Sequence, residues 1–186
     1  QAVALFSIND DDTTGTPIGE LTWVDTADDP ALSQVVSLHI APNADHLYVT
    51  AAGSSQVSLI RYSDQDEDGL PELEPSPIAE SYAVNPPNAS ALAPDGEHLL
   101  VLSDTANTLT RFRRDPISGL LPGQEPAPPE PPLTFDQPLP GDNAGLDAPT
   151  AIAFTSDGRH VLVSTSGSGS TDALAVYSRR APDPLF

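Results

Sequence analysis

An acidic segment in the first half of the chain has the spacing of a metal-binding loop. It reads DQDEDGLPE and runs from Asp64 to Glu72. Carboxylates at its positions 1, 3, 5 and 9, with glycine at position 6, match the front of a calcium loop, in which alternate residues converge on one ion. We therefore expect Ca²⁺ at this loop, bound by Asp64, Asp66, Asp68, Glu72 and the carbonyl of Leu70.

The same loop departs from the usual calcium pattern at two places. Its twelfth position is Pro75, where a helical calcium hand has a bidentate glutamate, and Pro71 does not suit the helix of such a hand. The predicted site is therefore weak, with a Kd of roughly 10⁻⁴–10⁻³ M, as in extracellular modules. A solvated acidic turn is the other interpretation of these residues, and the sequence leaves both open.

Histidine is the other residue type here that could bind a metal or transfer a proton. His46, His98 and His160 recur at one position of an internal repeat, so they fall on separate structural units rather than around one centre. We interpret these three as structural residues at the start of a strand. His39 lies at a position where the other repeats have alanine, and it is the one histidine that we treat as a functional candidate.

No catalytic motif stands out in the sequence. The chain has no cysteine, which excludes a thiolate nucleophile and a cysteine-based zinc site. It has no Gly-x-Ser-x-Gly elbow, and the glycine-rich run 167–170 lacks the lysine of a phosphate loop. Residues 88–90 form a glycosylation sequon, which has meaning in a secreted protein. We predict no catalytic residue and no cofactor other than Ca²⁺.

The overall charge narrows the possible partners. The 186 residues carry 7 basic and 27 acidic side chains, a formal charge of −20, and every basic residue is arginine. Such a surface repels nucleic acid and anionic membranes, and no apolar run approaches the ~20 residues of a membrane span. The one basic patch, residues 111–114, is interpreted as pairing locally with carboxylates. We expect an extracellular, cell-surface or periplasmic protein, processed or a fragment, since Gln1 comes first.

The elements that position these residues repeat along the chain. Residues 35–63, 89–114 and 149–180 share one pattern: an alternating run, a turn, a histidine, an apolar run, a polar turn and a second alternating run that ends in an aromatic residue. Alternation and Asp-Gly turns predict antiparallel strands joined by hairpins. The aromatic anchors of the repeat are Tyr62, Phe112 and Tyr177, with Phe6 as a fourth copy.

Each repeat is followed by one more strand candidate, at 20–24, 78–84 and 133–135. Four short strands per repeat are typical of a propeller blade, so we predict an all-β fold of four-stranded antiparallel β-propeller blades. Residues 1–30 form the end of one blade and 31–87 a full blade. Residues 88–148 form a blade with a proline-rich insertion, and 149–186 form an incomplete blade.

Two segments connect the chain to a known family. APDGEHLLV at 93–101 and DALAVYSR at 172–179 resemble the YVTN-type repeats of lactonase-like seven-bladed β-propellers. The resemblance covers nearly the whole chain outside the proline-rich insertion and implies a partial propeller of that kind. None of the family's lactonase-site residues can be placed on this chain, so none is carried over.

The predicted strands do not close a ring. The thirteen predicted strands begin in the middle of one blade and end in the middle of another. The terminal blade faces are therefore exposed, and we expect a partner to cover them. The partner is another protein, the remaining blades of the propeller, or a second copy in an oligomer. We favour a non-enzymatic exported scaffold for protein–protein interaction over the alternative, part of a lactonase-like hydrolase acting on a sugar lactone, because the inner strands are mostly apolar.

Overall fold

The computed structural model describes residues 2–8, 17, 19–42, 46–63, 72–121, 134–135, 146–167 and 173–178. Within these ranges the chain forms strands and one short 3-10 turn, which confirms the all-β prediction. The elements are β1 (Ala2–Ile8), β2 (Leu21–Asp28), η1 (Pro30–Leu32), β3 (Val35–Ile40), β4 (His46–Ala51), β5 (Gln56–Ser63), β6 (Glu72–Ala83), β7 (Ala89–Leu92), β8 (His98–Ser103), β9 (Thr108–Arg113), β10 (Thr134–Phe135), β11 (Pro149–Phe154), β12 (His160–Thr165) and β13 (Ala173–Ser178).

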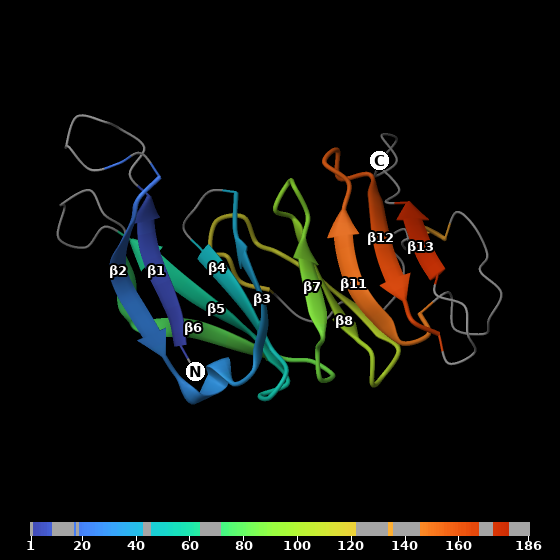
Figure 1. The fold of residues 1–186 in the computed structure, drawn as a ribbon, viewed down its shortest axis with the longest axis horizontal. Coiled ribbons are helices and arrows are strands. Elements are labelled where there is room, and N and C mark those ends of the chain that lie inside the picture. The colour runs from blue at the N-terminus through green and yellow to red at the C-terminus, as the bar shows by residue number, and fades with distance from the viewer. Residues whose placement is uncertain are drawn as a thin grey trace.

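The strands form four antiparallel sheets, in the orders β1-β2, β3-β4-β5-β6, β7-β8-β9 and β11-β12-β13-β10. Figure 1 shows the sheets side by side in chain order, with β1 and β2 at one end and β13 at the other. The inner strands β3, β7 and β11 are neighbours. These are propeller blades, and the described part of the chain does not close them into a ring.

The hairpin at the start of each blade follows from local turn chemistry. Asp95 Oδ1 accepts a hydrogen bond from the backbone N–H of Glu97 at 3.0 Å, and Gly96 supplies a positive φ of 71°. Asp157 makes the same contact to the N–H of Arg159 at 3.0 Å. These two turns are followed by His98 and His160 as the first residues of β8 and β12, and β4 likewise begins at His46, as predicted from the repeat.

The hydrophobic core lies in layers between the blades. One layer joins β1–β2 to the β3–β6 blade, the second joins that blade to β7–β9, and the third joins β7–β9 to β11–β13. The aromatic anchors follow one rule. Tyr62, Phe112 and Tyr177 each pack into the layer shared with the preceding blade. Phe6 has no such layer among the described residues and is 48% exposed.

The placement of strand 133–135 was wrong. We predicted it as the outer strand of the β7–β9 blade, but β10 pairs with β13, with Thr134 opposite Ser178 and Phe135 opposite Tyr177. The outer edge of the third strand of a blade offers backbone groups with which a fourth strand can pair. Since β10 lies between the two blades in the sequence, the repeat spacing alone does not say which of the two edges it joins.

Two other boundaries also differ. β2 continues beyond the predicted 20–24 to Asp28, and β6 begins before the predicted 78–84, at Glu72. In this region Asp25 lies in β2, and Asp29 is the N-cap of η1. Asp25 Oδ2 accepts a hydrogen bond from the backbone N–H of Leu73 at 3.2 Å, and Asp29 accepts one from Ala31 N–H at 2.7 Å. Short acidic side chains satisfy backbone donors here, so they are structural.

Candidate functional site

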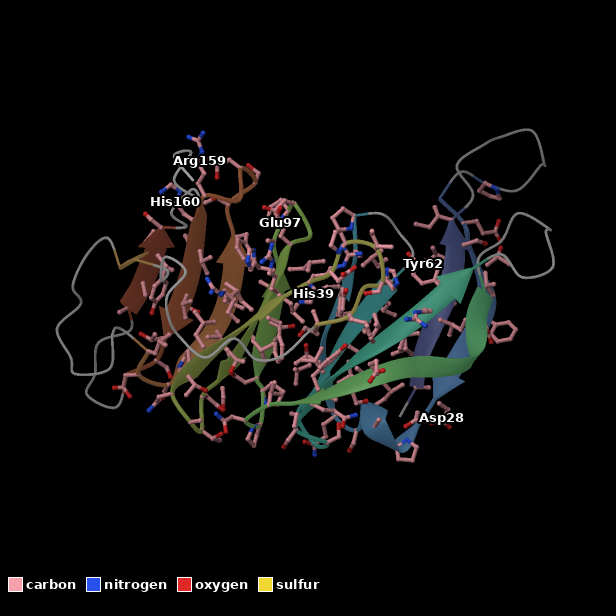
Figure 2. All side chains as sticks on the ribbon, turned by 180° about the vertical axis from the view of Figure 1, so that it is seen from behind. Asp28, His39, Tyr62, Glu97, Arg159 and His160 are labelled. Atoms are coloured by element: carbon pink, nitrogen blue, oxygen red, sulfur yellow. The ribbon has the colours of Figure 1, made fainter. Side chains whose placement is uncertain are left out.

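The most concentrated polar chemistry lies where two inner strands meet. Ser37 and His39 alternate on β3 and face β7, so both reach Ser90 in the middle of that strand. Alternation places the apolar residues of β3 on the opposite side. Figure 2 shows His39 near the middle of the molecule, whereas Glu97, Arg159 and His160 lie toward one end of the strands.

Ser90 is the centre of this cluster. Its Oγ lies 2.6 Å from Ser37 Oγ, 2.9 Å from His39 Nε2 and 2.8 Å from Thr50 Oγ1. A hydroxyl has one proton and two lone pairs, so three partners use its full hydrogen-bonding capacity. Ser90 is 7% exposed and Thr50 is fully buried. The cluster therefore ties the β3–β6 blade to the β7–β9 blade.

The Ser90–His39 distance is also that of a nucleophile and its general base. Burial lowers the pKa of His39 below its ordinary value, and the hydrogen bond with Ser90 raises it in part. The ring is therefore neutral at pH 7 and able to accept a proton. Among the described residues, however, no hydrogen bond joins the second ring nitrogen to a carboxylate, as a triad requires.

The sequence identified His39 and missed Ser90. His39 stood out because the other repeats have Ala91 and Ala153 in its place. Ser90 follows the same logic, since its repeat equivalents are Leu38 and Ile152, both apolar. A hydroxyl at an otherwise apolar inner position was therefore a signal available in the sequence.

His46 belongs to a second buried polar group. Arg114 is 5% exposed; its Nε donates to Tyr48 Oη at 2.8 Å, and its Nη2 lies 3.4 Å from His46 Nδ1. Tyr48 Oη in turn donates to the carbonyl of Gly119 at 2.5 Å. Burial raises the pKa of Tyr48, so the donating hydroxyl keeps its proton. The group links β4 to the segment that follows β9, which supports a structural role for His46.

A third group has metal-ligand types but not the character of a built site. The side chains of Asp95, Glu97 and His98 have potential ligand atoms within 4.8 Å of one another, and both acids are exposed. Asp95 already caps the turn. The equivalent turn has Arg159 where this one has Glu97, so the hairpin does not depend on a second acid there.

The predicted calcium residues fall almost entirely outside the described ranges. Asp64, Asp66, Asp68 and Leu70 are outside them. Glu72 is the first residue of β6, and its backbone pairs in register with Ser63, the last residue of β5. The two ends of the acidic segment are thus held together by the β5–β6 ladder. The Ca²⁺ prediction stays a prediction.

The sequon at residues 88–90 is built into the fold. Asn88 Nδ2 donates to the backbone carbonyl of Pro149 at 2.6 Å, and Asn88 Oδ1 is buried. The hydroxyl of the third residue, Ser90, is the centre of the buried cluster. A glycan on Asn88 would break the contact to Pro149, so the folded chain does not present this sequon as an acceptor.

Comparisons with known proteins support the fold. No protein-family model matches the sequence, and no curated protein matches it. A candidate 6-phosphogluconolactonase from Bacteroides fragilis is similar in structure with a TM-score of 0.60 and 16% identity, over 95% of this chain and 47% of that one. A candidate 6-phosphogluconolactonase from Bacteroides uniformis gives 0.58 and 15%, over 96% and 48%.

A protein from Lactobacillus plantarum gives a TM-score of 0.51 and 16% identity, over 86% of this chain and 48% of that one. Among the described residues, no helix has the length and apolar character to cross a membrane. Identities this low carry fold and not activity. The chain thus has a propeller-type fold similar to these three structures, and it spans about half of their length.

Proposed function

We propose that these blades form a scaffold that binds another protein rather than an enzyme, and that they work outside the cell. The observation that carries the proposal is the exposed outer face of the β1–β2 sheet. Phe6 lies opposite Trp23 and Ile8 lies opposite Leu21. Their exposed fractions are 48%, 60%, 65% and 58% in that order. We call these four residues the outer apolar face.

The outer apolar face is equivalent to an interface that the chain builds elsewhere. The counterparts of Phe6 on the other blades, Tyr62, Phe112 and Tyr177, pack against a preceding blade. Soluble proteins rarely leave a contiguous apolar patch open without a use for it, and tryptophan is enriched at the centres of interfaces. The repeat therefore favours a partner whose β-sheet packs on the outer apolar face in the way that one blade packs on the next.

The experiment compares baits that differ at this face. The chain is immobilised and exposed to an extract of its source cells, and retained proteins are identified by mass spectrometry. Phe6→Ser with Trp23→Ser should abolish retention of the specific partner. Ile117→Ser is the matched control, because Ile117 is 89% exposed but lies on the loop after β9. Equal retention by all three baits would show that the outer apolar face is not the binding surface.

Calcium is part of the proposal as a stabilising ion at Asp64, Asp66, Asp68, Glu72 and the Leu70 carbonyl. Support comes from the spacing of the acids and from the Ser63–Glu72 pair that closes the ends of the segment. Clustered carboxylates repel one another unless a cation neutralises them. Binding to the folded form alone would raise the melting temperature.

Calorimetric titration tests the ion. Asp66→Asn with Asp68→Asn should abolish the binding heat of the wild type. Asp10→Asn with Asp11→Asn removes the same charge from an acidic run without the glycine spacing, and should leave the heat unchanged. If the wild type shows no binding heat and no change in melting temperature at about 5 mM Ca²⁺, the segment does not bind calcium and is a solvated acidic turn.

A hydrolase acting on a sugar lactone is the second candidate, and the 2.9 Å contact between His39 Nε2 and Ser90 Oγ favours it. Two observations weigh against it: Ser90 is 7% exposed, and a net charge of −20 repels an anionic sugar phosphate. A panel of neutral and phosphorylated lactones tests it by release of acid. Turnover that Ser90→Ala abolishes would favour the hydrolase, and no turnover above buffer would favour the scaffold.

A further inference from the structure

The β1–β2 sheet lacks the inner half of a blade. In the β3–β6 blade the two inner strands are β3 and β4, and the outer strands β5 and β6 follow them. By the repeat, β1 is equivalent to β5, since Phe6 occupies the position of Tyr62. β1 pairs with β2 on one edge, and the described residues place no strand on its other edge. That edge is where an inner strand belongs.

A row of apolar side chains faces the same vacant position. Val36, Leu38 and Ile40 alternate along β3 on the side opposite to His39, and they are 39%, 49% and 63% exposed. The equivalents of Leu38 and Ile40 on β11 are Ile152 and Phe154, which pack with the core layer shared with β7–β9.

The difference between the two rows has a simple cause. The row on β11 has an inner strand, β7, beside it. Among the described residues, the row on β3 has the outer strands β1 and β2 on that side, and these cover the β4 residues Leu47 and Val49 with Val3 and Ala27. The inner strand β3 therefore lacks the neighbour that β7 and β11 each have.

We propose that the free edge of β1 and the apolar row of β3 form a seat for a β-hairpin: two antiparallel strands with alternating apolar side chains that complete the β1–β2 blade. One strand of the hairpin pairs with β1, and the other lies beside β3 and covers the row. This rests on the proposed function of a protein-binding scaffold, to which it adds a second binding surface and the class of partner that fits it. The partner hairpin would be equivalent to the inner hairpins that the chain itself forms three times, at β3–β4, β7–β8 and β11–β12.

The strand inventory disfavours a second copy as the occupant. A copy would have to present an inner hairpin whose second strand has a free edge. β4, β8 and β12 are each the second strand of an inner hairpin, and each is already paired on both edges. The three similar structures are about twice as long as this chain.

The test supplies the hairpin in tandem. A copy of residues 35–56, which comprise β3, β4 and the turn into β5, is fused directly before Gln1. By the repeat, the position before Gln1 is equivalent to Gln56, so the copy leads into β1 as β4 and its turn lead into β5. Hydrogen exchange of the β1 amides should slow at least about tenfold, and the melting temperature should rise by about 5 °C or more. A fusion with the same 22 residues in shuffled order is the control and should show neither change.

A substitution in the seat makes the result specific. Leu38→Asp in the chain's own β3 should shift the melting temperature of the unfused chain by less than about 2 °C, because the side chain is 49% exposed. In the fusion it should remove most of the gain. A folded fusion whose β1 amides exchange as fast as before, or whose gain survives Leu38→Asp, overturns the proposal.

Two measurements distinguish this proposal from the role of the outer apolar face and from pairing with a second copy of the chain. Trp23 is the only tryptophan and lies on the outer apolar face, not in the seat, so its emission should be unchanged by the fusion. Failure of the fusion therefore leaves the role of the outer apolar face standing. Sedimentation equilibrium of the unfused chain should give a monomer; a two-copy mass with protected β1 amides would make a second copy the occupant and overturn the proposal.

Discussion

Replacing Ser90 by alanine should destabilise the fold far more than the loss of an exposed hydroxyl. Ser90 Oγ bonds to Ser37, His39 and Thr50 at once. The substitution leaves Thr50, which is fully buried, without this partner, at a cost of about 1–3 kcal/mol. Ser37 and His39 are half-buried and can turn toward water, so they add less. We expect a loss of about 2–3 kcal/mol.

Urea unfolding followed by circular dichroism measures this loss. Ser166→Ala is the matched control, because Ser166 is exposed and its hydroxyl makes one bond, to the carbonyl of Ala148. It should cost less than about 0.5 kcal/mol. Adding Thr50→Val to Ser90→Ala removes the orphaned hydroxyl, so the double variant should lose about 1 kcal/mol less than the sum of the two single variants.

The outcome also discriminates between interpretations of the cluster. If Ser90→Ala costs no more than Ser166→Ala, the contacts around Ser90 do not tie the blades together, and the reasoning from burial is wrong. If the double variant is strictly additive, Thr50 and Ser90 do not depend on each other, and the 2.8 Å contact between them carries no energy.

Three further predictions concern single residues. Gly119→Ala should cost several kcal/mol of unfolding free energy, because the new Cβ would lie 2.4 Å from His46 Cδ2 at a φ of +71°. Gly19→Ala is the control in the same urea assay and should cost about 1 kcal/mol, because Gly19 has a φ of +86° but open space around it. Equal costs for the two variants would refute the steric argument. Burial lowers the pKa of His39 from 6.5, so the unfolded chain takes up the proton first. The unfolding free energy should therefore fall as the pH drops below about 6.5 toward the lowered pKa and be level above, and His39→Gln should flatten this dependence; an unchanged slope in the variant would exclude His39 as its source. Tyr48→Phe should cost about 1–3 kcal/mol, since the buried Arg114 Nε and the carbonyl of Gly119 both lose their partner; a loss below about 0.5 kcal/mol by thermal unfolding would contradict this.

The sequence was sufficient for the repeat and for the hairpins because both depend on local chemistry. Asp95 and Gly96 form their turn with residues that are next to them in the chain, and Asp157 and Gly158 do the same. Strand alternation likewise predicted which residues share a face. The exposure of Leu38 and Ile40 follows from that alternation once β1 and β2 are recognised as outer strands.

Contacts between blades were not predictable in the same way. Ser90 and His39 are 51 residues apart, and Arg114 and Tyr48 are 66 apart. Whether such residues meet depends on how far one blade is shifted along its neighbour, and no local pattern encodes that shift. The repeat fixed the blade position of each residue, so it identified candidates such as His39 but not their partners.

Strand edges were the other place where sequence reasoning failed, for a physical reason. An interior strand such as β4 has its pairing fixed on both sides by short turns, whereas β10 is joined to β9 and β11 by long segments. A long connection costs little more entropy to close than a shorter one, so backbone pairing decides where the strand goes. β10 pairs with the outer edge of β13 at two positions, Thr134 with Ser178 and Phe135 with Tyr177. The free edge of β1 is governed by the same rule, and a hairpin with the right alternation is what it should accept.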